Sequence, residues 1–447
     1  MKTPICDFVQ SYAQRHALRL HMPGHKGHGP LGVEQLDITE IEGADSLYEA
    51  NGIIQQSEEN AGALFGCRTF YSTEGSSLCI RAMLYLALQY AKHKNKAPLI
   101  AAARNVHKSF LSAVAMLDLD VLWLYPNHAD SYLSCQIRPD ELDGILEATP
   151  EKPAAIYLTS PDYLGYLADV SGIARVCRKH DVLLLVDNAH GAYLRFIEPS
   201  LHPMDLGADM CCDSAHKTLP VLTGGAYLHI SPSAPELLAK QAKSALSLFG
   251  STSPSYLILQ SLDAANPYLQ DHPRRLAAFL PLIHKLKRQL CAHGYTLCGD
   301  EPLKLTIATK SYGYRGNELA QMLQQEGIVC EFSDPDYLVL MFTPENSPQD
   351  LLRLEQALLN VPPKVPLLER PPEVQRRKPC MSVREALLSA SETAPLSELC
   401  ARILATPSVS CPPAVPILVC GEQIDENAVA CFRYYGINAC SVVTEQS

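Results

Sequence analysis

Lys217 is the residue of this chain whose surroundings best suit covalent chemistry. It lies in the segment "DSAHKTLPVLTGG", Asp213–Gly225, directly after the apolar run "ADMCC" and beside Ser214 and His216. A lysine becomes a nucleophile when desolvation or a neighbouring positive charge lowers the pKa of its amine. A hydroxyl and an imidazole beside it could also bind a phosphate. The residue types therefore indicate a reactive amine with an anion site next to it.

A second group of candidates precedes a helical pattern in "STEGSS", residues 72–77. Gly75 lets the backbone approach a ligand closely, and Ser76 and Ser77 offer hydroxyl groups. The first turn of the helix adds N–H groups that have no partner within the helix. These features predict a phosphate cradle, and an ordinary helix cap is the alternative interpretation.

Further candidates stand at or after the ends of three strand-like runs. His107 in "RNVHKS" comes after "LIAAA", and a structural histidine is the alternative there. Asp187 ends the run "LLLVD", with His190 three residues later. An acid at this place can hold a cationic nitrogen, coordinate a metal or cap the next turn. Asp162 in "TSPDYLG" is more simply explained as a turn-forming residue.

Strand-like and helical patterns alternate between about residues 60 and 230. The strand-like runs are "APLIAAA", "VLWLY", "AAIYLTS", "VLLLVDNAH", "ADMCCDSAH" and "GGAYLHI". The helical stretches between them include "SSLCIRAMLYLALQYAKHK", "SFLSAVAMLDL" and "GIARVCRKHD". This alternation predicts an α/β fold with a mostly parallel sheet that helices cover on both faces. Ligands of such sheets bind beyond the carboxyl ends of the strands, which is where the candidate residues lie.

The rest of the chain predicts smaller units. A long helix that ends at Gly294 is followed by the strands "LKLTIAT" and "YLVLMFT" around the helix "NELAQMLQQEG". We expect an N-terminal helix and loop at 1–45, a large domain at 46–270 and a small α+β domain at 271–365. A Pro-rich linker at 366–380 and a C-terminal domain at 381–447 complete the predicted division.

The composition narrows the classes of partner. The 447 residues carry a formal net charge of −11, and 47% of them are hydrophobic. An acidic chain offers no basic face to nucleic acid, and it weakly favours a cationic substrate. We find no signal peptide and no apolar run of membrane-spanning length, so no membrane partner is expected. The 16 cysteines contain no C-x-x-C pair, and we expect reduced thiols in a cytoplasmic protein.

The candidates together match the needs of one cofactor. Pyridoxal 5'-phosphate has a phosphate, an aromatic ring, a ring nitrogen that must stay protonated and an aldehyde that a lysine captures. The chain also resembles the fold-type-I pyridoxal-phosphate-dependent decarboxylases of ornithine, lysine and arginine. The matching stretches are "HMPGHKGHG", "DSLYEANGII", "FYSTEGSS", "RNVHKS", "LTSPDYLGYLADV", "LLLVDNAHGAYL", "DSAHKTLPVLTGGAYLH" and "CPPAVPILVCGEQI".

The resemblance implies a fold and an activity. The expected fold is a seven-stranded, mostly parallel sheet with helices on both faces, a small α+β domain and a C-terminal decarboxylase-family domain. The length suggests the shorter form of the family, without an N-terminal receiver-like domain. The implied activity is decarboxylation of arginine, lysine or ornithine to its amine and CO2, as in polyamine biosynthesis, by a homodimer or a higher homo-oligomer.

The resemblance also implies a role for each candidate. Lys217 would form the internal aldimine, which leads to a quinonoid, while Asp187 pairs with the ring nitrogen and His107 stacks on the ring. Ala189 would pack on the other face of the ring, and His190 would lie near the ring oxygen or the substrate. The phosphate would be held by Gly75, Ser76, Ser77, Ser214 and His216. The expected catalytic residues are Lys217, Asp187, His107 and His190.

The chain departs from the family pattern at three positions. Asp162 stands where the family usually has a hydroxyl residue, and Cys411 and Ala414 stand where it usually has Tyr and Gly. The acids Asp45, Glu74 and Asp162 are candidates for binding the distal cation of the substrate.

Several alternatives stay open on the sequence alone. The same cofactor serves transamination and elimination, and Arg315 is the small-domain arginine that could bind a substrate carboxylate. A metal hydrolase built on His21, His25 and His28 is another reading, although the Gly- and Pro-rich loop "MPGHKGHGP" does not suit a helix that would align them. A catalytically silent homologue that binds pyridoxal phosphate is the third.

Overall fold

The computed structural model describes residues 1–126, 131–409 and 413–444, which form two compact units. The first unit comprises residues 1–97, 154–156 and 170–276. The second comprises residues 98–153, 157–169 and 277–447. The division into five segments expected from the sequence stays a prediction.

A seven-stranded sheet has the strand order β1-β7-β6-β5-β4-β2-β3. Strands β5 and β6 pair in parallel, as do β2 and β3, whereas β7 pairs antiparallel with both β1 and β6. The predicted mostly parallel, seven-stranded sheet is therefore confirmed. Its strands are β1 Arg68–Ser72, β2 Leu99–Ala103, β3 Asp120–Leu124, β4 Ala155–Thr159, β5 Leu183–Asp187, β6 Met210–Asp213 and β7 Ala226–Ile230.

The first unit surrounds its strands with helices whose apolar faces are buried. In α6, Val170, Ile173, Ala174 and Cys177 recur at helical spacing, and all four are buried. Every residue of β5 and β6 is buried, as expected of strands covered on both faces, and these include Cys211 and Cys212. The helices of this unit are α1 Pro4–Gln14, η1 Leu47–Glu49, α2 Ile53–Phe65, α3 Gly75–His93, α6 Val170–Lys179, η2 Ala192–Phe196, α7 Pro203–Leu206, α8 Ala215–Thr218, α9 Glu236–Phe249 and α10 Tyr256–Gln270.

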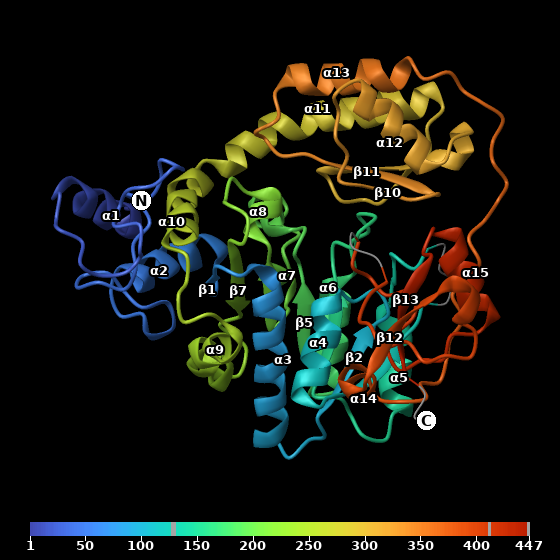
Figure 1. Ribbon diagram of the computed structural model, residues 1–447, viewed down its shortest axis with the longest axis horizontal. Coiled ribbons are helices and arrows are strands. Elements are labelled where there is room, and N and C mark those ends of the chain that lie inside the picture. Colours follow the sequence, from blue (N-terminus) through green and yellow to red (C-terminus); the bar gives the residue numbers. More distant parts are fainter. Residues whose placement is uncertain (127–130, 410–412, 445–447) are drawn as a thin grey trace. The chain divides into compact units, whose positions relative to one another are not determined.

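The second unit contains a four-stranded antiparallel sheet with the order β10-β11-β9-β8. Its strands are β8 Leu297–Cys298, β9 Lys304–Ala308, β10 Phe332–Ser333 and β11 Tyr337–Met341. Figure 1 shows α12 Gly316–Gln325, α13 Pro348–Leu359 and the later part of α11 His272–His293 together on one face of this sheet. The strands and helices predicted for a small α+β domain are present, and α11 ends just before Gly294, which has a φ of +112°.

The C-terminal part of the second unit has its own apolar core. Buried side chains of Leu404, Ile424, Phe432 and Val442 contribute to one cluster there. The elements around it are α14 Val383–Leu388, the antiparallel pair β12 Ser391–Pro395 and β13 Ala439–Val443, η4 Leu396–Glu398 and α15 Glu426–Tyr434. The remaining elements of the second unit are α4 Lys108–Leu117, α5 Pro139–Ala148 and η3 Thr309–Tyr312.

Two further observations concern the cysteines and the apolar character of the helices. Every cysteine that the structure describes is a free thiol. Within the described residues, no helix combines the length and the apolar character that crossing a membrane requires.

Candidate active site

Lys217 lies in the one-turn helix α8, which directly follows the carboxyl end of β6. The sequence predicted a lysine just past a strand but not the helical turn. Its amine Nζ is 2.9 Å from Nε2 of His190, so the ammonium group can donate a hydrogen bond to the imidazole. His190 is 6% exposed and lies on the segment that leaves the end of β5. The two strand ends therefore bring a lysine and a histidine into direct contact.

Asp187 is the last residue of β5, and its side chain is almost completely buried. Its Oδ1 accepts a hydrogen bond from the backbone N–H of Ala189 at 3.2 Å. The thiol of Cys212, which lies opposite Asp187 in the strand register, donates to the same oxygen at 3.7 Å. Burial raises the pKa of Cys212 well above its usual value, so this thiol stays protonated and can donate. The N–H of Ala189 and the thiol of Cys212 thus fix the Oδ1 atom of Asp187.

The predicted phosphate cradle lies at the N-terminus of the 19-residue helix α3. Gly75 has a φ of +70°, and a Cβ atom built on it would meet nothing within 4 Å. The first turn has no side-chain cap and no acidic residue, and the N–H of Gly75 donates to the carbonyl oxygen of Gly224 at 2.7 Å. The positive end of the helix dipole at this terminus favours an anion. The hydroxyl of Ser214 donates to the hydroxyl of Ser76 at 2.8 Å, and Ser77 lies in the same turn. Hydroxyl groups from two elements therefore meet at an uncapped helix end.

His216 lies next to Lys217 and donates from Nδ1 to the carbonyl oxygen of Gly225 at 3.0 Å. Burial, together with the charge of Lys217, lowers the pKa of this imidazole. The ring is therefore neutral at pH 7 in the chain alone, with a lone pair on Nε2. A phosphate close to it would favour the protonated ring, which could then donate through Nε2.

His107 belongs to the second unit and is the N-cap residue of α4. Its Nδ1 accepts the backbone N–H of Ser109 at 3.2 Å and lies 2.9 Å from the hydroxyl of the same residue. This arrangement places the ring proton on Nε2. The alternative reading of a structural histidine therefore has support, while stacking on a cofactor ring stays a prediction.

The residues of the first unit fit pyridoxal phosphate. An amine, a buried carboxylate and an uncapped helix terminus with two hydroxyl groups are the donor set that its aldehyde, ring nitrogen and phosphate require. The contacts 190–217 and 76–214 connect the ends of β5 and β6 and the start of α3. The lysine, the acid and the phosphate cradle predicted from the sequence are therefore brought together by the fold.

The acids proposed for the distal cation of the substrate have other partners. Asp45 accepts backbone N–H groups from Gly52 at 2.8 Å and from Ile54 at 3.1 Å, which anchors the start of α2. Glu74 accepts the N–H of Ser251 at 2.6 Å. Both carboxylates thus hold the backbone of their own unit, which does not support a role in substrate binding.

Asp162 is fully buried in the second unit. One of its oxygens accepts the hydroxyl of Ser134 at 2.5 Å and the amide of Gln136 at 3.2 Å, and the other accepts the N–H of Tyr166 at 2.9 Å. Burial raises its pKa, although these hydrogen bonds oppose the increase. The turn-forming role considered from the sequence agrees with these contacts.

The other departures from the family pattern fall in the C-terminal part. Ala414 has a φ of +56°, the left-handed region in which glycine is favoured, and its carbonyl oxygen accepts the N–H of Lys108 at 2.9 Å. Alanine thus stands in a conformation that suits the family's glycine, beside the turn that carries His107. Cys411 lies outside the described residues.

The residues of two alternative readings have partners of their own. Tyr12 binds Nε2 of His21 at 2.6 Å, and Asp37 binds Nε2 of His25 at 3.2 Å, so these histidines hold the loop that follows α1. Arg315 pairs with Glu369 at 2.6 Å. Neither arrangement favours a metal hydrolase or a carboxylate clamp.

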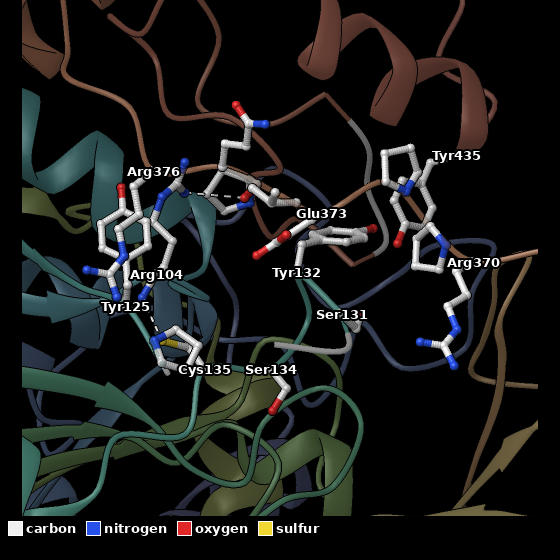
Figure 2. Close-up of a pocket in the computed structure, with 16 residues that line it drawn as sticks. Arg104, Tyr125, Ser131, Tyr132, Ser134, Cys135, Arg370, Glu373, Arg376 and Tyr435 are labelled. Atoms are coloured by element: carbon white, nitrogen blue, oxygen red, sulfur yellow. Dashed lines mark hydrogen bonds between the residues drawn. The ribbon is translucent and has the colours of Figure 1, made fainter. Parts of the chain in front are cut away.

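The second unit contains a cavity of about 640 Å³. Figure 2 shows Arg104, Tyr125, Tyr132, Glu373 and Tyr435 around it. Arg104 precedes the His107 turn, and its guanidinium pairs with Glu422 at 3.0 Å. Sequence reasoning did not identify this cavity because the linker that lines it lies more than 200 residues from Arg104 along the chain.

The sequence reasoning also missed a buried polar cluster behind Lys217. Asp213, His202, His229 and Asn188 contact one another and are completely buried. The available signal was an acid, Asp213, that ends an apolar strand in the same way as Asp187.

Comparison with known proteins agrees with this geometry. The family described as "Orn/Lys/Arg decarboxylase, major domain" matches residues 3–294, and "Orn/Lys/Arg decarboxylase, C-terminal domain" matches residues 367–441. An arginine decarboxylase of Bacillus subtilis is 30% identical over 475 residues, which cover 96% of this chain and 92% of the relative. An arginine decarboxylase of Halalkalibacterium halodurans is 29% identical, and the match covers 97% and 93%.

Solved structures show the same fold. A lysine decarboxylase of Francisella novicida superposes with a TM-score of 0.80 at 17% identity, covering 99% of this chain and 81% of that chain. The constitutive lysine decarboxylase of E. coli gives a TM-score of 0.75 at 18% identity, with 99% and 82% covered.

Proposed function

Because the chain belongs to the Orn/Lys/Arg decarboxylase family, it is a decarboxylase of basic amino acids, and we propose that it converts arginine to its amine and CO2 with pyridoxal phosphate. The observation that carries the proposal is the contact between Lys217 and His190 beside Asp187. Arginine is favoured over lysine because the relatives with about 30% identity are named arginine decarboxylases, whereas the structures named lysine decarboxylases are 17–18% identical.

The bound cofactor would supply an aldehyde for the amine of the substrate and a ring that accepts the electron pair left when CO2 departs. Lys217 would hold that aldehyde until a substrate amine replaces it. Asp187, a buried carboxylate at the end of β5, would pair with the ring nitrogen and keep the proton on it. The N–H and hydroxyl groups of the α3 terminus, with Ser214, would hold the phosphate.

Proton transfer falls to the residues around the reacting carbon. His190 lies within hydrogen-bond distance of the Lys217 amine, so it can take a proton from the ammonium group and leave a nucleophilic amine. Lys217 or His107 would then return a proton to the substrate carbon after CO2 has left. Ala189, with its small side chain at the end of β5, would leave room for a flat ring.

We propose that the working unit is a homodimer or a higher homo-oligomer. Several large apolar side chains are exposed in the loop after α1, where Leu18 and Leu20 are each 83% exposed and Leu31 is 80% exposed. An interface between copies of the chain would account for exposed apolar side chains that occur together in one loop. A second copy of this chain would cover them.

The test of the proposed function has two parts. Borohydride reduction of the chain with pyridoxal phosphate, followed by digestion and mass spectrometry, should mark the peptide that contains Lys217. A Lys217→Ala variant should lose the mark, and a Lys240→Ala variant, which changes an exposed lysine of α9, should keep it. A mark on another lysine would refute the assignment.

The second part is the substrate. Arginine, lysine and ornithine are offered separately, and CO2 and the amine products are measured. Arginine should give the highest kcat/KM, and Asp187→Ala should lower kcat on it by at least 100-fold while pyridoxal phosphate still marks Lys217. Release of a keto acid instead of CO2 would favour transamination.

A further inference from the structure

The carboxylate of Asp213 is completely buried and accepts three hydrogen bonds. Nδ2 of Asn188 donates to Oδ1 at 2.6 Å. Nε2 of His202 and Nε2 of His229 both donate to Oδ2, at 3.0 Å and 3.1 Å. A carboxylate without access to water is stable only with such donors, so this cluster is a built feature of the fold and not a chance contact.

The cluster connects the two strand ends of the candidate active site. Asp213 is the last residue of β6, four residues before Lys217. Asn188 directly follows Asp187, the last residue of β5, and its backbone N–H donates to the carbonyl oxygen of Cys212 at 3.0 Å. The hydrogen bond from the Asn188 side chain to Asp213 therefore extends the pairing of β5 and β6 by one residue beyond the sheet.

Asp213 acts from the face of the sheet opposite to Asp187. Successive side chains of a strand point to opposite faces, and the thiol of Cys212 points to the carboxylate of Asp187. Asp213, the next residue, consequently points to the other face, where it meets His229 of β7. Any effect of Asp213 on Asp187 and Lys217 therefore passes through the backbone of the strand ends.

The hydrogen bonds define which atoms carry protons. Nδ1 of His202 accepts the N–H of Met204 at 3.3 Å, so the proton of this ring lies on Nε2. Burial raises the pKa of Asp213, but His202 and His229 outweigh this effect and hold the pKa below its usual range. The carboxylate therefore stays charged. Burial lowers the pKa of His229, and Cys67 and Asp213 outweigh that effect and raise it, which favours a protonated ring as the counter-charge.

A metal ion is the other possible use of these residues. Ligand atoms of His202, Cys211 and Asp213 lie within 4.8 Å of one another. The Nε2 atom of His202 carries the proton that it donates to Asp213, however, so it has no lone pair to offer. Burial raises the pKa of Cys211 well above its usual value, which keeps its sulfur protonated as well. The hydrogen-bonded arrangement is the one that the geometry favours.

We propose that Asp213 is a positioning residue, which fixes the end of β5 with Asp187 against the end of β6 with Lys217 through its bonds to Asn188, His202 and His229. This inference rests on the proposed function for its consequence, because the two strand ends would hold the ring nitrogen and the aldehyde of one cofactor. Loss of the carboxylate leaves two imidazole N–H groups and an amide without their shared acceptor, and the strand ends separate more readily.

The primary experiment uses the full-length chain without cofactor. Hydrogen–deuterium exchange is followed in peptides that cover residues 185–190 and 212–218 for the unchanged chain, Asp213→Asn and Asp209→Asn. Asp209 is the matched control, because it lies at the opposite end of β6 and binds the N–H of Leu184 in β5 at 2.7 Å. Asp213→Asn should speed exchange in both peptides at least 10-fold, and Asp209→Asn should change it less than threefold.

The second readout is the affinity for pyridoxal phosphate, measured by the visible absorbance of the bound cofactor. Asp213→Asn should raise the dissociation constant at least 10-fold, and Asp209→Asn less than threefold. Equal effects of the two variants would mean that Asp213 contributes general stability alone, which would overturn the proposal. If the exchange results agree with the proposal but the unchanged chain binds no pyridoxal phosphate at Lys217, the proposed function fails. The exchange data then still test whether the hydrogen bonds of Asp213 hold the two strand ends together.

A variant pair on β7 covers the case in which Asp213→Asn does not fold. His229→Gln keeps an N–H donor near the position of Nε2, whereas His229→Leu removes it. The glutamine variant should retain slow exchange in residues 185–190, and the leucine variant should lose it. Equal exchange in both variants would refute the proposal that these hydrogen bonds hold the two strand ends together. A stoichiometric metal ion in the purified chain, measured by elemental mass spectrometry, would also refute it.

Discussion

Replacing Glu422 with glutamine should destabilise the second unit strongly, because this residue balances a buried cation. Oε2 of Glu422 accepts Nη2 of Arg104 at 3.0 Å and the N–H of Val419 at 2.8 Å. The two charged side chains are 9% and 2% exposed, so water can replace little of what each partner provides. Glutamine keeps the shape of the side chain but leaves the guanidinium of Arg104 without its counter-charge.

The expected size follows from the burial of both partners. Removing one member of a buried ion pair costs about 3–5 kcal/mol. For a unit of roughly 150–250 residues, 1 kcal/mol corresponds to about 2–4 °C in Tm, so Glu422→Gln should lower the Tm of the second unit by roughly 6–20 °C. An exposed pair contributes about 0.2–1 kcal/mol. The pair of Arg402 with Glu392, where the acid is 54% exposed, is the matched control, and Glu392→Gln should lower the Tm by at most about 4 °C.

Differential scanning calorimetry of the full-length chain measures both variants, and hydrogen exchange identifies which unit has lost stability. Exchange should increase in the peptide that covers residues 104–110, because Arg104 anchors the turn before His107. The double variant Arg104→Met and Glu422→Leu removes both charges, and it should recover more than half of the lost Tm. A Glu422→Gln Tm equal to that of Glu392→Gln would refute the reasoning, as would a double variant whose loss equals the sum of the single losses.

Three other predictions concern pH, backbone conformation and assembly. Burial raises the pKa of Asp334 to about 7, whereas its pKa in the unfolded chain is about 4. Protonated Asp334 therefore contributes its full stability below about pH 4, and this contribution is lost as the pH rises through about 7. Asp334→Asn should therefore raise the Tm by several degrees at pH 8 and change it little at pH 5; the same gain at both pH values would contradict this sign. Ala414→Val should lower the Tm by several degrees because a β-branched residue does not tolerate a φ of +56°, while Ala414→Gly should stay within about 2 °C of the unchanged chain. Leu20→Ser with Leu31→Ser should shift the mass in sedimentation velocity toward the monomer, and Leu368→Ser, at an 89% exposed position of the linker, should not; a monomeric unchanged chain would disprove the proposed interface.

Much of the large sheet could be predicted because its strands are short apolar runs between amphipathic helices. The runs that became β2, β4, β5 and β6 are continuous and apolar, which is the pattern of strands covered on both faces. The helical turn at Lys217 could not be predicted, because α8 has four residues and no periodicity can be measured over so short a segment. The start of α3 was predictable because a Gly and two Ser residues stand at the beginning of a long helical pattern, while phosphate binding there stays a prediction.

Contacts between distant segments were beyond the reach of sequence reasoning. The sequence left a substrate-binding role open for Asp45 and Asp162, because it does not show whether an acid on a loop contacts a ligand or the backbone. The fold surrounds each of them with N–H or hydroxyl donors from its own unit, so their charges are used to fix loops. In the same way, the partner of Arg104 lies 318 residues further along the chain.

Asp187 and Asp213 show why a strand-end acid is an ambiguous signal. Each ends an apolar strand, on neighbouring strands of one sheet, and each is almost completely buried. The register places Asp187 opposite Cys212, so the residue after Cys212 must point to the other face of the sheet. One acid is thus directed to the face that carries Ala189 and the other to the imidazoles of His202 and His229. A shift of the register by one residue would exchange the two faces, and the acid that supports the strand ends would become the acid beside the lysine. The proposed chemistry of this site would therefore depend on the pairing of β5 with β6, and the hydrogen bonds of Asp213 lie at the ends of these two strands.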